Sequence, residues 1–327
     1  MSYCKDTRIE LLRSRGMPII ETLEDFSNEL LISEVILKRI YLHSYTYYKE
    51  FYIQKNSSSK ELRKIAAPKY TLKVIQAWIL RNILEKVELS PFAMAYRKGN
   101  EFGIKCNADM HKDKEFIMKV DFKNFFSSIS RKIVFYMFND FGYSNSISNL
   151  FANICTYNES LPQGAVTSPY ISNIVLIKFD EDMYEFCLNQ DITYSRYSDD
   201  IILSCNRRKP LNDSKDFIDE LTKKYNYLEI NYDKSFNIYG KDTAKIVTGL
   251  LVNNGDVRVT REYKRLLRAQ LYTELKVNNM DPSEEIYGKL AFIRSVDQST
   301  FIQMVNYIKN IGIDNKFKSE FLAIPKL

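Results

Sequence analysis

Tyr197-Ser198-Asp199-Asp200 is the most informative stretch of this sequence. It lies between two strand-like runs, residues 192–196 and 201–205. This arrangement predicts a β-hairpin with two adjacent aspartates at its turn. Neighbouring carboxylates repel each other, and a divalent cation is the simplest agent that would offset the repulsion. Mg²⁺ fits best, because it prefers carboxylate oxygen, phosphate and water as ligands. Taken alone, the pair favours an ordinary surface turn.

A third carboxylate comes from a separate predicted strand. In residues 116–122 the apolar side chains run in alternation from Phe116 to Phe122, which places Asp121 on the opposite face. We expect the apolar face to pack on helices and the Asp121 face to look into a cleft. Together with the aspartate pair, Asp121 would complete a site for two metal ions about 3.5–4 Å apart, which stabilise an in-line displacement. Polymerases use this chemistry.

A third segment, Leu161-Pro162-Gln163-Gly164, continues into Ser168-Pro169. Proline and glycine on either side of Gln163 predict an irregular backbone, followed by a helix from about residue 171. The alternative is simply a loop that leads into a helix, with Ser168 as the cap and Pro169 in the first turn.

In this order, the three segments resemble motifs A, B and C of the reverse transcriptases: Lys119-Val120-Asp121-Phe122 through Phe126, then Leu161-Pro162-Gln163-Gly164, then Tyr197-Ser198-Asp199-Asp200. The resemblance implies an α+β fold, the right-hand polymerase fold, with fingers, a palm built on an antiparallel sheet and a helical thumb. It also implies Asp121 and Asp199 as principal ligands of two Mg²⁺ ions, with Asp200 beside them.

The resemblance implies roles for residues around this metal site. Phe126 matches the steric gate that excludes a ribose 2′-hydroxyl, and Gln163 matches a residue that touches the template or the incoming nucleotide. Arg63 and Lys64 resemble the fingers strand that contacts the triphosphate, where a guanidinium can grip phosphate bidentately. Lys234 would protonate the leaving pyrophosphate as a general acid. Core packing stays open for Phe126, and a solvated surface charge stays open for Arg63 and Lys234.

Two short segments resemble signatures of the retron branch of the reverse transcriptases. Asn107-Ala108-Asp109-Met110-His111 resembles the NAxxH signature upstream of motif A, and Val247-Thr248-Gly249 resembles the VTG signature after motif D. The resemblance implies that this outer region helps to bind the protein's own structured RNA, with RNA contacts assigned to the following residues: Asn107, His111, Val247, Thr248 and Gly249. A loop histidine bonded to the backbone is the alternative for His111.

Two positions depart from the family pattern. Ser198 stands where alanine is commoner, and its small side chain should be tolerated in the hairpin. Asn124 stands where many relatives carry an acid, so it cannot supply a negative charge. Neither departure removes a predicted metal ligand.

The resemblance also divides the chain. It predicts an N-terminal helical region over residues 1–45, fingers over 46–115, a palm with an inserted fingers segment over 116–252, and a thumb over 253–327.

Local patterns add detail to this division. Strand-like runs at 48–54 and 62–66, joined by a polar turn at 56–59, predict a hairpin. A further strand is expected at 228–232, in the segment that resembles motif D, and a hairpin turn at 253–256. In the N-terminal region, Ser33 is a candidate helix cap and Val35 begins the apolar stripe that follows it.

A basic stripe is expected on the first helix of the predicted thumb, which Thr260 can cap. Four cationic side chains fall within roughly a third of the helix circumference: Arg261, Lys264, Arg265 and Arg268. They would straddle the phosphates of a template–primer duplex, contacts that bind without reading sequence. A solvated helix face is the alternative.

Composition agrees with a nucleic-acid partner and narrows the other possibilities. The 327 residues carry a net charge of +6, a modest basic bias. Five scattered cysteines and two histidines make a zinc site improbable. There is no run of about 18 apolar residues for a membrane span, and the polar N-terminus lacks a signal peptide's apolar core. We therefore expect no membrane partner and a cytoplasmic protein.

The combined expectation is a bacterial retron-type reverse transcriptase. It would copy part of a partner non-coding RNA into branched single-stranded DNA (msDNA), using dNTPs and Mg²⁺. The resemblance further implies priming from the 2′-hydroxyl of a branching guanosine, a role in phage defence and an effector protein partner. Two alternatives stay open: another bacterial reverse transcriptase of the group II intron-like or diversity-generating type, and an RNA-binding scaffold that holds an effector.

Overall fold

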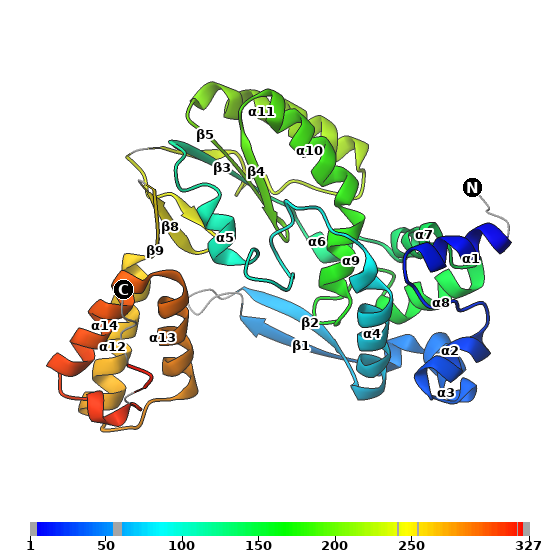
Figure 1. The fold of residues 1–327 in the computed structure, drawn as a ribbon, viewed down its shortest axis with the longest axis horizontal. Coiled ribbons are helices and arrows are strands. Elements are labelled where there is room, and N and C mark those ends of the chain that lie inside the picture. The colour runs from blue at the N-terminus through cyan, green and yellow to red at the C-terminus, as the bar shows by residue number, and fades with distance from the viewer. Residues whose placement is uncertain (1–4, 55–60, 241, 254, 319, 323–327) are drawn as a thin grey trace.

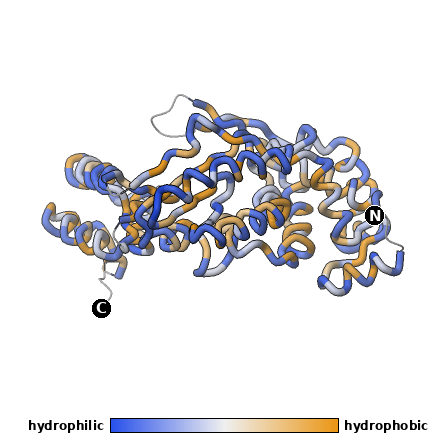
Figure 2. Tube along the Cα trace, turned by 90° about the horizontal axis from the view of Figure 1, so that it is seen from above, coloured by the Kyte–Doolittle hydropathy of each residue, from blue (hydrophilic) through white to orange (hydrophobic). Residues whose placement is uncertain are grey.

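The computed structural model of the chain describes residues 5–54, 61–240, 242–253, 255–318 and 320–322. The molecule is elongated, with the N-terminal helices at one end and the C-terminal helices at the other (Figure 1). Seen from above, the same elongated outline is built of chain in which hydrophobic and hydrophilic stretches alternate (Figure 2).

Helices and strands are mixed along the described ranges. The α-helices are α1 (Lys5–Ser14), α2 (Leu23–Leu30), α3 (Glu34–Leu42), α4 (Tyr70–Asn82), α5 (Ile104–Asp109), α6 (Phe125–Ser128), α7 (Arg131–Phe141), α8 (Asn145–Cys155), α9 (Ser168–Val175), α10 (Ile177–Asn189), α11 (Arg208–Lys224), α12 (Arg261–Gln270), α13 (Glu284–Val296) and α14 (Gln298–Asn310). Short helices of other types are η1 (Ser44–Tyr47), η2 (Leu84–Lys86), η3 (Leu271–Val277) and η4 (Asp314–Lys316). The strands are β1 (Tyr48–Gln54), β2 (Leu62–Pro68), β3 (Phe116–Asp121), β4 (Thr193–Tyr197), β5 (Asp200–Cys205), β6 (Asn237–Tyr239), β7 (Ile246–Val247), β8 (Leu250–Asn253) and β9 (Asp256–Val259).

The central sheet has the strand order β4-β5-β3-β6, and each neighbouring pair is antiparallel. Met118 and Val120 point to one face, where they join the large core with Phe179 of α10 and Ile218 of α11. Figure 1 shows α10 and α11 lying over this sheet. Because side chains alternate along a strand, Asp121 lies on the other face, as the sequence predicts.

The N-terminal part of the chain contains helices followed by the predicted hairpin. Strands β1 and β2 pair from Tyr48 opposite Pro68 to Gln54 opposite Leu62, which confirms the hairpin, although its predicted turn at 56–59 lies outside the described residues. Ser33 occupies the position before α3, but its side chain makes no capping hydrogen bond. The prediction of this cap is therefore right in position only.

The strand predicted at 228–232 is wrong. Among the described residues, this segment makes one isolated bridge, between Ile230 and Phe122. Two backbone bonds flank this bridge, from the Lys123 N–H to the Glu229 carbonyl and from the Asn231 N–H to the Asp121 carbonyl, both at 2.8 Å. The pairing ends there because a turn follows, in which the Lys234 N–H donates to the Asn231 carbonyl at 3.0 Å. The strand that pairs with β3 at this edge is β6, five residues further along.

A second sheet, β7-β8-β9, leads into the C-terminal helices. Asn253 pairs with Asp256, which confirms the hairpin turn predicted there, and the predicted boundary between residues 252 and 253 falls inside this hairpin. Thr260 caps α12 as expected, since its hydroxyl accepts from the Tyr263 N–H at 3.2 Å. The second sheet and α12–α14 share a second hydrophobic core, which also takes in Ile117 of β3.

Candidate active site

The three predicted acidic residues meet at one end of the central sheet. Asp121, the last residue of β3, is the direct cross-strand partner of Asp200, the first residue of β5. Ser198 and Asp199 form the two-residue turn between β4 and β5, and the Phe122 N–H donates to the Asp199 carbonyl at 3.2 Å. Directly opposed residues in an antiparallel pair have Cβ atoms about 4.5–5.5 Å apart. Residues nearly 80 positions apart in the sequence are thus brought together.

Burial and mutual repulsion disfavour the charged form of these carboxylates. Burial, followed by the nearby Asp199 and Asp121 charges, raises the pKa of Asp200 to about 6. Burial also raises the pKa of Asp199, with a further contribution from Asp121, while Arg63 acts in the opposite direction. The site therefore favours the binding of a cation, which would offset the repulsion.

Asp121 is held by Asn231, which lies in the segment that resembles motif D and has no predicted role of its own. The Asn231 side-chain amide donates to Asp121 Oδ2 at 2.7 Å. The Asp121 backbone N–H donates to the Ser235 hydroxyl at 3.0 Å. These bonds leave the second carboxylate oxygen of Asp121 available for a ligand in the cavity. The bridge between Ile230 and Phe122 is what places Asn231 beside this carboxylate.

The donor set fits Mg²⁺ in a particular way. Across the part of the chain that the structure describes, no three His, Cys, Asp or Glu side chains form a ready-made metal cage. Mg²⁺ does not need one, because it usually binds one or two carboxylates and takes its other ligands from substrate phosphates and water. Asp121 and Asp199 line the adjoining cavity, whereas Asp200 is not among its lining residues. This placement agrees with two principal ligands and a third acid beside them.

The cavity in front of the aspartates has a volume of about 750 Å³. It is enclosed by β2, the end of β3 and the segment after it, the loop at 157–163, and the turn that follows Asn231. Six residues with predicted roles lie along its wall: Arg63, Lys64, Asp121, Gln163, Asp199 and Lys234. The structure thus brings most of the predicted metal- and nucleotide-binding residues around one space.

The loop that carries Gln163 is fixed against β2. The Ala66 N–H donates to the Gln163 carbonyl at 2.8 Å. Gly164 has φ +124°, and a Cβ added there would lie 2.9 Å from the Ala66 carbonyl oxygen. Glycine is therefore required by both the backbone conformation and the close approach. The main chain of Gln163 is pinned, which positions its side chain at the cavity wall.

Phe126 does not line the cavity itself. Its half-buried ring lies 5.5 Å from the Phe125 ring and 6.3 Å from the Tyr96 ring, measured between centroids. Tyr96 was not predicted as a site residue, yet its hydroxyl is 3.1 Å from the Ser198 hydroxyl in the turn between β4 and β5. Phe126 therefore lies beside Tyr96, and Tyr96 in turn contacts the turn that carries Asp199.

Two side chains of the NAxxH segment are buried against the central sheet and do not reach the surface. Asn107 and His111 are both 0% exposed. The Ser195 hydroxyl donates to Asn107 Oδ1 at 2.6 Å, so it accepts from His111 Nε2 at 2.7 Å, and His111 Nδ1 lies 2.6 Å from the Ser204 hydroxyl. This burial contradicts direct RNA contact by Asn107 and His111. Their role is to lock α5 onto β4 and β5.

The VTG segment is a tight turn between β7 and β8. Val247 is fully buried and pairs with Leu250, which contradicts direct RNA contact by its side chain. Thr248 and Gly249 both have positive φ, of 45° and 82°, as a two-residue hairpin turn with matching twist requires. The Thr248 hydroxyl donates to the carbonyl of Ile104 in α5 at 2.9 Å. Both retron-like signatures therefore contribute hydrogen bonds that attach α5 to the two sheets.

The basic stripe of α12 is partly engaged within the C-terminal helices. The Lys264 ammonium donates to the Thr300 hydroxyl at 3.1 Å, and the Arg268 guanidinium lies 5.4 Å from the centre of the Tyr307 ring. Arg261 and Arg265 are exposed. These two arginines are the better placed for phosphate contacts.

Comparison with known proteins decides the family. The family model "Reverse transcriptase (RNA-dependent DNA polymerase)" matches residues 53–258. The retron Ec86 reverse transcriptase of Escherichia coli is 32% identical over 300 residues, which cover 92% of each chain. The chain belongs to the retron branch of the reverse transcriptases.

Further relatives support this assignment. The retron Se72 reverse transcriptase of Salmonella heidelberg (strain 579083-10) is 30% identical to this reverse transcriptase over 80% of this chain and 69% of its own. The retron Ec83 reverse transcriptase of Escherichia coli is 29% identical over 77% of this chain and 84% of its own.

Solved structures confirm the predicted α+β right-hand polymerase fold. A telomerase from Candida albicans matches 81% of this reverse transcriptase with a TM-score of 0.51 and 12% sequence identity, a likeness of fold alone. This chain spans about half, 54%, of that telomerase chain. No helix within the described ranges has the length and apolarity that crossing a membrane would require.

Proposed function

We propose that this reverse transcriptase copies part of a structured non-coding RNA into branched single-stranded DNA, msDNA, by nucleotidyl transfer at the site of Asp121, Asp199 and Asp200. One observation carries the proposal: Asp121 pairs with Asp200 across neighbouring strands, beside the turn that holds Asp199, at the wall of the 750 Å³ cavity. The retron relatives cover most of the chain and support this type of product.

Asp121 and Asp199 are the residues that we propose to hold two Mg²⁺ ions, with Asp200 beside them. When bound, the ions lower the pKa of the primer hydroxyl and neutralise charge on the triphosphate and on the leaving pyrophosphate. The chain's contribution is to present the carboxylates in fixed positions. Asn231 orients Asp121 through its 2.7 Å hydrogen bond, and the β4–β5 turn orients Asp199.

The cationic residues of the cavity wall suit the triphosphate. Arg63 is the stronger candidate, because it lies close enough to Asp199 to influence that carboxyl and a guanidinium can bind phosphate bidentately. Lys64 is bound to Glu50 at 2.6 Å, so it would have to leave this partner to reach a nucleotide. Lys234 is exposed and also lines this cavity, where a lysine can protonate the leaving pyrophosphate.

Two residues are proposed to select the nucleotide. Phe126 excludes a ribose 2′-hydroxyl, through a ring that packs between Phe125 and Tyr96. Gln163 contacts the template or the incoming base, because its pinned main chain holds the side chain at the cavity wall.

The regions that surround the site are proposed to act as in other polymerase hands. Residues 1–45 form an N-terminal helical region, 46–115 the fingers, 116–252 the palm with its inserted segment, and 253–327 the thumb. Arg261 and Arg265 of α12 are proposed to contact duplex phosphates, with Lys264 and Arg268 in support. Thr248 and Gly249, at the exposed tip of their turn, remain candidates for contact with the partner RNA.

The biological setting is proposed from the relatives. Priming from the 2′-hydroxyl of a guanosine in the partner RNA, an effector protein partner, a part in phage defence and a bacterial cytoplasmic location all follow from the retron resemblance. Curated retron relatives come from Escherichia, Salmonella and Myxococcus, which supports a bacterial source.

The test is to purify the protein from cells together with its bound nucleic acid and to treat that nucleic acid with a 2′–5′ debranching enzyme. The proposal predicts DNA joined covalently to RNA, which the enzyme separates into two strands. Linear DNA without a branch would instead indicate another type of bacterial reverse transcriptase. RNA without any DNA would indicate an RNA-binding scaffold.

A further inference from the structure

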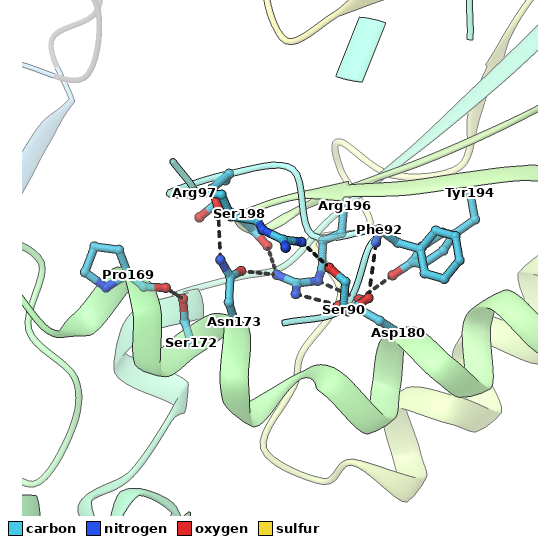
Figure 3. Close-up of polar contacts among 11 residues, drawn as sticks. Ser90, Phe92, Arg97, Pro169, Ser172, Asn173, Asp180, Tyr194, Arg196 and Ser198 are labelled. Atoms are coloured by element: carbon cyan, nitrogen blue, oxygen red, sulfur yellow. Dashed lines mark hydrogen bonds and ion pairs between the residues drawn. The ribbon is translucent and has the colours of Figure 1, made fainter. Parts of the chain in front are cut away.

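A fully buried ion pair lies directly beneath the catalytic turn (Figure 3). Arg196 and Asp180 are both 0% exposed and form two hydrogen bonds of 2.7 Å each. The Tyr194 hydroxyl also donates to Asp180, at 2.6 Å. Burying two charges has a considerable desolvation cost, so both side chains need further hydrogen bonds.

Those further bonds connect the turn with a distant segment. Arg196 Nη1 donates to the Ser198 carbonyl and to Asn173 Oδ1, both at 3.1 Å. The Asn173 amide in turn donates to the carbonyl of Ala95 at 2.9 Å. One guanidinium therefore holds the catalytic turn and, through Asn173, the segment that approaches Tyr96.

The segment at 92–96 runs parallel to β4 and is tied to it on both sides of Arg196. The Arg196 N–H donates to the Phe92 carbonyl, and the Met94 N–H donates to the Arg196 carbonyl, both at 2.8 Å. Ala93 forms the parallel bridge between them. The position of this segment relative to the turn is thereby fixed by backbone bonds as well as by Asn173.

At the end of this segment, Tyr96 contacts the turn. Its hydroxyl lies 3.1 Å from the Ser198 hydroxyl, and its ring lies 6.3 Å from the Phe126 ring. Tyr96 and Ser198 both have φ +62°, a left-handed backbone that side chains other than glycine rarely adopt. Two strained residues that meet through their hydroxyl groups need surrounding bonds to persist, and such strain is typical of functional sites.

We propose that Tyr96 is a positioning residue for the catalytic turn: its phenol fixes Ser198, and through Ser198 the place of Asp199 relative to Asp121. The inference rests on the proposed catalytic role of Asp199. It also gives a use to the serine that stands where alanine is commoner, because alanine would offer the phenol no hydrogen-bond partner on the turn. The buried Arg196 network holds the backbone of the turn, and the Tyr96–Ser198 hydrogen bond fixes the Ser198 side chain.

The experiment compares Tyr96→Phe, Ser198→Ala and the double variant in single-nucleotide incorporation on an RNA template annealed to a DNA primer. A lost hydrogen bond of this kind should lower the maximal incorporation rate by about three- to tenfold. The dNTP concentration for half-maximal rate should stay within about twofold. The double variant should be no slower than the slower single variant, since both remove the same bond.

Two controls separate positioning from folding. Active-site titration and thermal unfolding should give the wild-type active fraction and melting temperature, because Tyr96→Phe keeps the ring and Ser198→Ala keeps Cβ. Tyr184→Phe is the matched control: its ring stacks on Phe92 at 4.3 Å, and within the described ranges its hydroxyl makes no hydrogen bond. It should incorporate nucleotides at the wild-type rate.

Wild-type rates in both single variants would overturn the proposal. So would independent losses that multiply in the double variant, or a slower rate that is accounted for by a reduced active fraction. These outcomes differ from failure of the proposed function itself, in which Asp199→Asn would continue to incorporate nucleotides.

Discussion

Asp121 illustrates how much one residue of this site depends on partners to which the motifs assign no role. Asn231 and Ser235 fix its side chain and backbone, and neither residue carries a sequence signal of its own. Arg196 is a similar case, because a charged residue in a strand is usually assigned to the surface, yet its side chain is fully buried. Residue types could be matched to a family pattern, but the partners that orient them depend on contacts between distant segments.

At this scale, Phe126→Ala tests the proposed sugar gate. Removal of the ring should open space for a ribose 2′-hydroxyl and lower the selectivity for dNTP over rNTP by about tenfold or more, equivalent to about 1.4 kcal/mol. The measurement is single-nucleotide incorporation with each nucleotide type. Phe186→Ala is the control, because Phe186 is also half-buried but stacks on Phe217 at the other side of the sheet. Unchanged selectivity in Phe126→Ala would assign the ring to packing alone.

At the level of helices and strands, the sequence pattern correctly predicted those elements whose contacts are local. The hairpins at 48–68 and 250–259 and the turn between β4 and β5 follow from alternation and turn residues, and they are confirmed. The register that places Asp121 opposite Asp200 could not be read from local pattern, because it joins strands separated by several helices. The strand expected at 228–232 failed because a turn begins at Asn231, so its pairing with the segment after β3 stops at the single bridge between Ile230 and Phe122.

Helix α5 shows a second limit of sequence patterns. Its two retron-like signatures suggested RNA contact, whereas their side chains mostly attach α5 to the two sheets. A short signature identifies positions that matter to a family, and it does not distinguish a contact with a partner from a contact within the fold. Burial decides between the two.

The buried histidine of this element gives a prediction on stability. Burial, assisted by the Lys114 charge, lowers the pKa of His111 to about 3, while in the unfolded chain it is about 6.5. Below about pH 6.5 the unfolded chain therefore binds one more proton than the folded chain. Stability from this group is complete above that pH and is lost as pH falls toward 3, at about 1.4 kcal/mol per pH unit.

Denaturant unfolding at pH 6.5 and pH 5, for the wild type and His111→Gln, measures this effect. The wild type should lose about 2 kcal/mol more than the variant over this interval. Comparison of the two slopes removes the other groups that titrate in the same range. Identical slopes would show that His111 is not buried in its neutral form.

For the whole molecule, two hydrophobic cores are arranged along an elongated body, and β3 contributes to both. Met118 and Val120 of β3 belong to the large core, whereas Ile117, near the other end of the strand from Asp121, belongs to the core shared with α12–α14. A duplex that leaves the cavity toward α12 would meet Arg261 and Arg265, two exposed members of the basic stripe, while exposed Arg268 stacks on Tyr307.

Replacement of Arg261 and Arg265 by alanine should weaken binding to an RNA–DNA duplex of any sequence. The slope of log affinity against log salt concentration should fall by about 2, one for each lost phosphate contact. Filter binding or fluorescence anisotropy over a salt series measures both quantities. Lys178→Ala with Lys224→Ala removes the same charge from α10 and α11, where both lysines pair with Asp182, and should leave the slope unchanged. Equal slopes in all three proteins would assign the stripe to a solvated surface.

The account as a whole depends on the convergence of Asp121 with the β4–β5 turn, and one double substitution tests it most directly. Asp199→Asn with Asp200→Asn keeps the size of both side chains and removes the charge that would hold Mg²⁺. Primer extension on an RNA template should be abolished, while binding of the same RNA should stay within about twofold of the wild type. DNA synthesis retained by this variant would contradict the central claim.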